Sequence, residues 1–296
     1  MVPPVVSIVI RTYNSAATLT ATIDSVRAQS LPVEVVVVDS GSTDDTLRIA
    51  QERAERLVGI PHEEFSYGGA LNAGAQAATT PFCGALSSHT VLPRPDWVEI
   101  GLEHLQAGAV AVCGGEVDGE NRPLTAPLRA DADYLGRYRY WGFTNTASMW
   151  RSEVWRAHPF DDSLVATEDQ EWSWRAVTGG RHLVVDPRLT VSGSHRRGAG
   201  VRAYHHRMVR EIRALEHVRP LGPYPATQAL ADWVRHAPSD PFVSPTRRFG
   251  RTRALDIVAR WEAGRQGRRG RVPQPRLTPR AAPRRGTDGE DVRADA

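Results

Sequence analysis

Two continuous runs of apolar, β-branched residues near the N-terminus limit the fold of this chain more than any other sequence feature. Residues 5–10 read VVSIVI and residues 34–39 read EVVVVD, and such runs are typical of strands buried on both faces of a sheet. Between them Leu19, Ile23 and Val26 recur at helical spacing. Because parallel neighbouring strands need a crossover of this length, the pattern predicts an α/β protein with a mostly parallel sheet.

The remainder of the first 200 residues continues this alternation less regularly. We expect further helices at residues 43–56, 68–78, 96–106 and 168–177, further strands at 82–86, 109–117, 144–150 and 182–186, and a loop at 119–136. Residues 1–200 are therefore expected to form one α/β domain. Residues 201–263 are expected to form a helical extension. Residues 264–296, rich in Arg, Pro and Gly, are expected to be a disordered tail.

Charge is distributed unevenly along the chain. Residues 245–296 carry 14 arginines and 6 acidic residues, whereas the whole chain has a formal net charge of +3. Such a tail attracts phosphates non-specifically or touches anionic lipid, and without interleaved aromatic residues it gives no support for specific nucleic-acid binding. The apolar stripe from Val201 to Leu215 leaves two interpretations open, a helix packed on the domain or a helix lying on a membrane surface.

Signals for localisation are few. No stretch approaches the roughly 20 apolar residues of a membrane span, and the first strand-like run starts too early for a signal peptide. Cys83 and Cys113 are isolated, which favours buried thiols over a disulfide or a metal site. We expect a cytoplasmic protein, with peripheral contact to the inner face of the membrane as the open alternative.

Three polar turns follow apolar strands: residues 11–14 (RTYN), 39–42 (DSGS) and 87–89 (SSH). In a parallel α/β sheet, ligands bind beyond the carboxyl ends of the strands, so these turns are expected to meet at one site. Asp39 can accept hydrogen bonds from a ribose or a base edge, and Tyr13 can stack on a base. Alternatively, Asn14 or Ser15 only caps the first helix, and Ser42 only caps the next one. No G-x-G-x-x-G or P-loop motif is present, which argues against dinucleotide and NTPase chemistry.

Five segments occur together in a recognisable order: VSIVIRTYN, EVVVVDSGSTDDT, FSYGGALNAGAQAA, PFCGALSSHTVLPRPDW and ATEDQEWSWRAVTGG. In this order and spacing the chain resembles glycosyltransferase family 2 over roughly residues 5–195, and its layout is similar to bacterial rhamnosyltransferase-like members. The resemblance implies a GT-A fold, a Rossmann-like sheet with flanking helices. It also implies a nucleoside-diphosphate sugar as donor and a hydroxyl acceptor on a sugar, a lipid-linked sugar or a small molecule.

The resemblance also implies the residues of the donor site. These residues lie in the turns after the expected strands or at the start of the glycine-rich helix. They are Thr12, Tyr13, Asn14, Asp39, Ser42, Asp44, Gly68, Gly69, Asn72 and Ser88. Family members often have arginine where this chain has Leu71. A diphosphate contact is therefore expected from another residue, such as Arg11, Arg196 or Arg197.

Glu168 and Asp169 match the acidic pair on the acceptor side, and the aspartate of that pair is the base in inverting members. An inverting transfer needs a carboxylate to take a proton from the acceptor hydroxyl, and Asp169 is the expected base, with Glu168 beside it. The two acids could instead only favour the helix dipole. Trp172 and Arg175, farther along the same helix, are expected on the acceptor side.

The expected metal site departs from the family pattern. His89 stands where members usually have an aspartate of a D-x-D type motif, and His195 matches a downstream histidine. A divalent cation, Mn²⁺ or Mg²⁺, is one expectation for these two histidines. Direct contact with the diphosphate is the second, and an inactive homologue that only binds nucleotide sugar is the third. Another nucleotide-sugar enzyme, such as a nucleotidyltransferase, is disfavoured because no basic glycine-rich loop follows the first strand.

Overall fold

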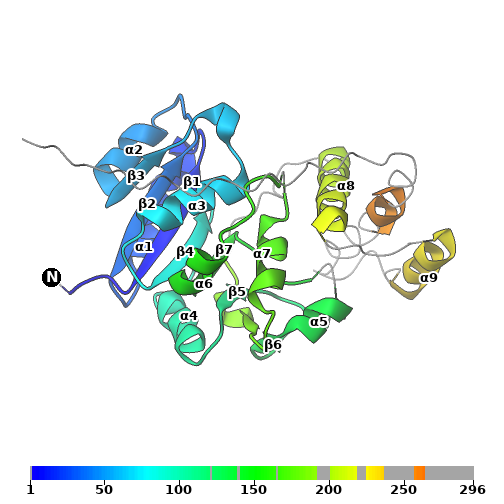
Figure 1. Cartoon of the computed structure of the whole chain (residues 1–296). Coiled ribbons are helices and arrows are strands. Elements are labelled where there is room, and N and C mark those ends of the chain that lie inside the picture. Colours follow the sequence, from blue (N-terminus) through cyan, green and yellow to red (C-terminus); the bar gives the residue numbers. More distant parts are fainter. Residues whose placement is uncertain are drawn as a thin grey trace, which may run out of the picture.

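The computed structural model describes residues 2–120, 122–138, 141–164, 166–191, 201–218, 225–236 and 257–263. These residues form one sheet flanked by helices on both faces (Figure 1). The strands are β1 (Val6–Thr12), β2 (Val33–Asp39), β3 (Arg56–Gly59), β4 (Phe82–Ser87), β5 (Ala111–Gly114), β6 (Leu128–Ala130), β7 (Ala147–Arg151) and β8 (Leu183–Asp186). The helices are α1 (Ala16–Arg27), α2 (Thr46–Arg53), η1 (His62–Glu64), α3 (Tyr67–Ala77), α4 (Trp97–Gln106), α5 (Ala132–Arg137), α6 (Ser152–Ala157), α7 (Glu168–Ala176), η2 (Pro187–Leu189), α8 (Val201–Val218) and α9 (Ala226–His236).

The strand order is β3-β2-β1-β4-β7-β5-β8-β6. Strands β1 to β4 run parallel, as do β5 and β8, whereas β7 is antiparallel to both of its neighbours and β6 is antiparallel to β8. In the register, Thr12 lies opposite Asp39 and Arg11 lies opposite Ser87. The carboxyl ends of β1, β2 and β4 therefore lie together at one edge of the sheet, as the sequence predicts.

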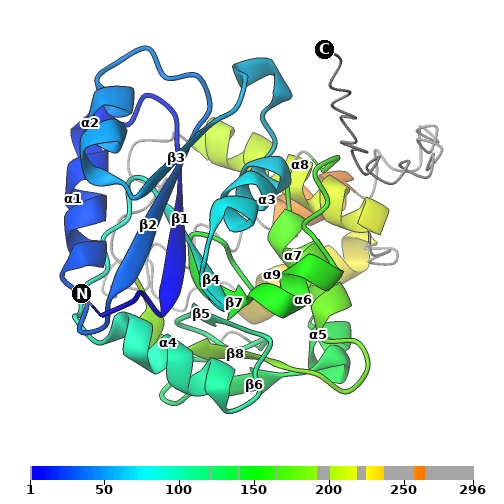
Figure 2. The ribbon, with the colours of Figure 1, turned by 60° about the vertical axis from the view of Figure 1, so that its left-hand side comes forward.

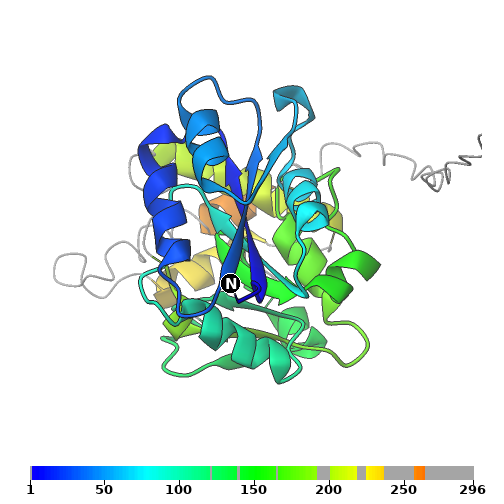
Figure 3. The ribbon, with the colours of Figure 1, turned by 90° about the vertical axis from the view of Figure 1, so that its left-hand side faces the viewer.

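Two apolar layers cover the sheet. α1, α2 and α4 pack on one face, and α3, α6 and α7 pack on the other, with the sheet between them (Figures 2 and 3). β1 shows why its apolar run is continuous: Ile8 and Ile10 belong to the first layer, whereas Val9 belongs to the second. The expected burial of β1 and β2 on both faces is confirmed. Cys83 and Cys113 are free, buried thiols.

Gly74 lets α3 approach the sheet closely. A Cβ atom at this position would lie 2.3 Å from Val9 Cγ1 and 2.9 Å from Val38 Cγ2. We expect Gly74→Ala to lower the free energy of unfolding by about 1–3 kcal/mol because the extra methyl group overpacks this layer. Urea denaturation measures the effect. Gly136→Ala in α5, where a Cβ meets nothing within 4 Å, is the control and should stabilise slightly through helix propensity; equal losses in both variants would contradict the explanation.

Several expected elements differ from the structure. The expected loop at 119–136 contains β6 and α5, because β6 is held by pairing with β8 and α5 begins where the Asp131 carboxylate accepts the Tyr134 N–H. The expected helix at 43–56 is shorter, and its last residue instead begins β3, which pairs with β2. Both corrections depend on strands that are distant in the sequence, and local periodicity does not report such contacts.

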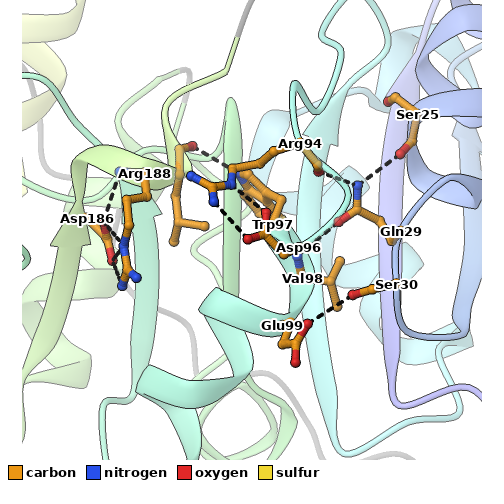
Figure 4. A network of polar contacts seen from close by, with 11 residues as sticks. Ser25, Gln29, Ser30, Arg94, Asp96, Trp97, Val98, Glu99, Asp186 and Arg188 are labelled. Carbon is orange, nitrogen blue, oxygen red and sulfur yellow. Dashed lines mark hydrogen bonds and ion pairs between the residues drawn. The ribbon is translucent and has the colours of Figure 1, made fainter.

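α4 is fixed to its neighbours by the polar contacts of Figure 4. Gln29 donates to the Arg94 carbonyl, and its side-chain oxygen accepts the Val98 N–H. The indole N–H of Trp97 donates to the Leu189 carbonyl at 2.9 Å. These bonds join the turn after α1 to α4 and to η2, so we assign this network a structural role.

α8 confirms the helix expected from the apolar stripe that begins at Val201. Val209 and Ile212 are buried against Ala259 and Ala263 of the helical residues 257–263, and His205 contacts Glu262 at 2.7 Å. The described part of α8 thus packs against protein. Within the described ranges, no helix combines the length and the apolar character needed to cross a bilayer. The tail expected at 264–296 lies outside the described residues.

Candidate active site

The turns after β1 and β2 are joined by hydrogen bonds into one cluster. The Asp39 carboxylate accepts the backbone N–H groups of Gly41 and Ser42 and the Ser42 hydroxyl. In turn, Ser42 Oγ accepts the Asn14 N–H at 2.8 Å, and Asn14 Oδ1 accepts the Thr43 N–H at 2.8 Å. The cluster therefore holds Asp39 and Asn14, two expected donor-site residues, in fixed positions.

The same cluster extends to the start of α1. Asp44 accepts the N–H of Ala16 at 3.1 Å, so it caps α1 from a neighbouring turn, whereas the expected cap Ser15 makes no capping bond. The Ser15 hydroxyl instead lies 2.8 Å from the Ser88 hydroxyl, which brings the turn after β4 to the same place. Thr12 is buried at the end of β1 beside this cluster. The structure thus brings together the expected residues Thr12, Asn14, Asp39, Ser42, Asp44 and Ser88.

An aromatic pair lies beside this cluster. Tyr13 stacks on His62 of η1 with ring centroids 4.5 Å apart, and the His62 ring nitrogen Nδ1 lies 3.2 Å from the Ser40 carbonyl. The Tyr13 side chain remains 46% exposed, so it offers an aromatic surface to a ligand. His62 carries no signal in the sequence, because it reaches the cluster only through tertiary packing.

The glycine-rich start of α3 packs elsewhere. A Cβ at Gly68 would lie 2.5 Å from the Asp161 carbonyl oxygen, and a Cβ at Gly69 would meet Ser66 Oγ at 2.9 Å. The Asn72 amide donates to the Phe160 carbonyl and accepts from the Phe160 N–H and the Trp155 indole. In this structure Gly68, Gly69 and Asn72 therefore hold the segment before α7 and are not joined to the Asp39 cluster.

A cavity of about 630 Å³ lies beside the carboxyl ends of β1 and β4. Its walls come from the ends of β1 and β4, the start of α3, the segment before β7, the start of α7 and one side of α8. The lining residues are Arg11, Tyr67, Ser87, Trp141, Gly142, Phe143, Thr144, Asn145, Thr146, Ala166, Thr167, Glu168, Asp169, Gln170, Arg207, Arg210 and Glu211. Both acids of the expected catalytic pair are among them.

The backbone at the start of α7 aims this acidic pair. Thr167 has φ 65° and ψ 20°, a left-handed conformation that is unfavourable for a β-branched residue. The Asp169 carboxylate accepts the N–H of Asn145 at 3.1 Å and the N–H of Gln170 at 2.8 Å. The side-chain amide of Asn145 also donates to Glu168 at 3.4 Å. Asn145, which no sequence motif marks, thus contacts both carboxylates.

Arg11 supplies the positive charge beside the pair. Its guanidinium donates to the Asn145 carbonyl at 2.9 Å and lies 3.5 Å from a Glu168 oxygen. It also lies over the Tyr67 ring, 5.4 Å from the centroid. Both Arg11 and Glu168 are nearly buried, with side-chain exposures of 12% and 6%. Of the three arginines expected as substitutes at the diphosphate, Arg11 lines the cavity, and Arg196 and Arg197 lie outside the described residues.

Burial and the charge of Glu168 together raise the pKa of Asp169 to about 7. The bonds from Asn145 and Gln170 and the charge of Arg11 oppose this rise without cancelling it. A carboxylate whose pKa lies near neutrality is suited to accept a proton in catalysis. The helix dipole alone would lower the pKa of a carboxylate at a helix start, so burial and Glu168 outweigh it at Asp169.

Neither Trp172 nor Arg175, the two residues expected on the acceptor side, lines the cavity. Trp172 is 0% exposed, packs among aromatic core residues and donates its indole N–H to the His158 carbonyl. Arg175 forms a two-bond ion pair with Glu171. The aromatic side chains that do line the cavity are Trp141, Tyr67 and Phe143. Positions in the sequence next to an acidic pair did not reveal this, because successive helix residues point in different directions.

The turn after β4 was the expected metal site. Burial and the charge of Arg11 lower the pKa of His89, so its imidazole is neutral near pH 7. Within the described ranges, no group of three or more His, Cys, Asp and Glu side chains could hold an ion, and the second expected ligand, His195, lies outside them. The positive charge of Arg11 also disfavours a second cation near His89. The described residues therefore do not by themselves fit a divalent-cation site.

The fold has close counterparts among solved structures. A mannosyltransferase from Pyrobaculum calidifontis, crystallised with GDP-Man and Mn²⁺, has a TM-score of 0.61 and 18% identity, covering 88% of this chain and 87% of that one. At this identity the likeness shows the fold alone, and it is the expected GT-A fold.

The sequence comparisons show the family. The family model described as glycosyl transferase family 2 matches residues 7–158. The glycosyltransferase AglE of Haloferax volcanii is 27% identical over 203 residues, covering 61% of this chain and 64% of the relative. The O-antigen chain rhamnosyltransferase RfbN of Salmonella typhimurium is 22% identical over 208 residues, covering 64% of this chain and 66% of the relative. The chain spans slightly less than two thirds of each relative's length, and its matched half shows that it belongs to glycosyltransferase family 2.

Proposed function

We propose that this protein transfers a sugar from a nucleoside-diphosphate sugar to a hydroxyl group with inversion, and that Asp169 is the general base. The observation that carries this proposal is the Asp169 carboxylate, which lines a cavity at the strand ends and has a pKa of about 7. As the base, Asp169 takes the proton of the acceptor hydroxyl while the hydroxyl oxygen attacks the anomeric carbon. The nucleoside diphosphate leaves from the opposite face of the sugar.

In this proposal the donor site extends from the Asp39 cluster to the cavity lined by Arg11 and Asp169. The nucleoside lies at the cluster of Asp39 and Asn14, where the exposed ring of Tyr13 can stack on the base. The diphosphate lies toward Arg11, because Arg11 is next to Thr12 on β1 and its guanidinium lines the cavity. Negative charge grows on the leaving diphosphate during transfer, and a buried arginine stabilises such charge. The mannosyltransferase from Pyrobaculum calidifontis, which binds GDP-Man, supports a donor of this chemical class.

Donor turnover by the purified full chain tests the proposed function. A thermal-shift screen over nucleoside diphosphates and their sugars first identifies the donor, since a ligand far above its dissociation constant raises the melting temperature. Release of nucleoside diphosphate is then measured with Mn²⁺, with Mg²⁺ and with EDTA. NMR of a transferred sugar gives its anomeric configuration. Binding without any release would favour the nucleotide-sugar-binding scaffold, and retention of configuration would contradict the inverting mechanism.

The pH profile tests the role of Asp169 separately. Because its pKa is raised to about 7, kcat/KM should fall as the pH drops through 7, where the base becomes protonated. Glu168→Gln removes the negative charge that raises this pKa, so the acidic limb should move to lower pH. A stopped assay between pH 5 and pH 9 measures the acidic limb of wild type and that of Glu168→Gln. An unchanged limb in Glu168→Gln would show that another group controls the acidic limb.

A further inference from the structure

One side of α8 faces the cavity, although α8 lies beyond the residues that the family model matches. Arg207, Arg210 and Glu211 are separated by three and four residues, so they share one side of the helix. Val209 and Ile212 lie on another side and are buried against residues 257–263. Packing on that side therefore fixes which residues α8 presents to the cavity.

The charges that line the cavity do not all pair with one another. Arg11 lies 3.5 Å from Glu168, and Arg207 lies 3.3 Å from Glu211. Arg210 is exposed to solvent and forms no ion pair with any residue in the described ranges. Among the lining arginines in the described ranges, Arg210 is therefore the one without a carboxylate partner.

Arg11 and the arginines of α8 line the cavity from different elements. Arg11 is carried by β1, which ends at the Asp39 cluster, whereas Arg207 and Arg210 are carried by α8, next to α7 with its Asp169. α7 and α8 are in contact. A donor at the Asp39 cluster approaches Asp169 from the side of β1, where Arg11 is available to its diphosphate. If the donor takes the side of β1, the side of α8 is left for the acceptor.

The neutral part of a sugar acceptor does not need this cation. Hydroxyl groups are bound by neutral hydrogen bonds, and sugar rings are bound by aromatic faces such as those of Trp141 and Tyr67, which line the same cavity. A guanidinium group in contrast matches the geometry and the charge of a phosphate. Since Arg207 is held by Glu211, Arg210 is the residue that remains to bind an anion, with Arg207 beside it.

We propose that Arg210 binds a phosphate group on the acceptor, so that the acceptor is a phosphorylated molecule, such as a sugar phosphate or a sugar linked to lipid through phosphate. This inference rests on the proposed function, because it takes Asp169 as the base that meets the acceptor hydroxyl. It assigns acceptor recognition to the helical extension rather than to the part of the chain that the family model matches.

The test keeps the donor site filled while the acceptor site is probed. The full chain is saturated with the nucleoside diphosphate that stabilises it most. Binding of glucose 1-phosphate, with glucose as the neutral probe, is then measured by calorimetry. We expect wild type to bind glucose 1-phosphate more tightly than glucose and Arg210→Gln to weaken that binding tenfold or more, the loss typical of a hydrogen bond to a charged group. Arg213→Gln is the matched control, because Arg213 is exposed on the same helix and does not line the cavity; its binding should equal that of wild type.

Three results would overturn the inference. The first is that wild type with nucleoside diphosphate bound does not prefer glucose 1-phosphate over glucose. The second is that Arg210→Gln binds glucose 1-phosphate as tightly as wild type does. Alternatively, Arg210→Gln loses affinity for the nucleoside diphosphate itself, which would place Arg210 in the donor site. Each of these leaves donor turnover by wild type intact, whereas absence of both nucleoside-diphosphate binding and turnover would overturn the proposed function and this inference with it.

Discussion

Asp169→Asn is expected to lower the rate of sugar transfer by about 10²- to 10⁴-fold, the usual contribution of a general base. The amide fills the same space and still accepts one of the two backbone N–H bonds, from Asn145 or Gln170, but it cannot take a proton. Initial rates with the identified donor measure the effect. Glu171→Gln is the control, since Glu171 lies on the same helix but pairs with Arg175 outside the cavity. Its transfer rate should remain within a few-fold of wild type.

The same substitution should make the protein more stable at alkaline pH. The pKa of Asp169 is raised in the folded state from its ordinary value of 3.8 to about 7, so folding disfavours its charged form. Wild type therefore loses stability as the pH rises from about 4 to 7, and Asp169→Asn escapes this loss. We expect a gain of about 1–2 kcal/mol at pH 8, which raises the melting temperature by about 2–4 °C per kcal/mol, and a smaller gain at pH 5. A variant that is inactive and also less stable at pH 8 would indicate a structural role instead.

Arg11→Met is expected to lower the free energy of unfolding by about 3–5 kcal/mol at pH 8, because it leaves the buried Glu168 and the half-buried Asp169 without their cation. The loss of stability in Arg11→Met is largest when Glu168 and Asp169 are both ionised. It decreases as the pH falls and these carboxylates bind protons. Urea denaturation at pH 8 and pH 5 measures the difference.

Two further variants separate charge from hydrogen-bond geometry. Arg11→Lys keeps the charge but loses the planar fork that reaches both Asn145 and Glu168, so it should recover part of the lost stability. Arg48→Met removes an arginine that pairs with Asp45 and Glu52 on the surface, and its stability should match wild type because water screens such pairs. Equal losses in Arg11→Met at pH 5 and pH 8 would show that packing, rather than charge, explains the effect.

The fold class could be predicted because its signals are local. The apolar runs that became β1 and β2 bury both of their faces, so the residues of each strand must be apolar almost without interruption. β6, β3 and the antiparallel placement of β7 could not be predicted in this way. These short strands are stable only because a partner strand, distant in the sequence, pairs with them.

The candidate site likewise contains residues that local sequence signals predict and residues whose role depends on tertiary contacts. Strand-end turns and family resemblance determined that Thr12, Asp39, Asn14 and Ser88 would meet, because the ends of parallel strands share one edge of a sheet. The same reasoning does not reveal the contacts of Asn72 and Trp172, which hold the segment before α7 and fill the core. An amide and an indole serve either role equally well, and only their neighbours in space decide which.

By itself, the sequence determined the α/β fold, the family and the acidic pair, since each is expressed in periodicity or in a short motif. Only the tertiary structure decided that Asp169 has a raised pKa, that Arg11 and Asn145 contact the acidic pair, and that α8 presents arginines to the cavity. Desolvation and charge–charge interaction depend on distances in space. Residues 11, 145, 169 and 210 are far apart along the chain, and folding alone brings them to one cavity.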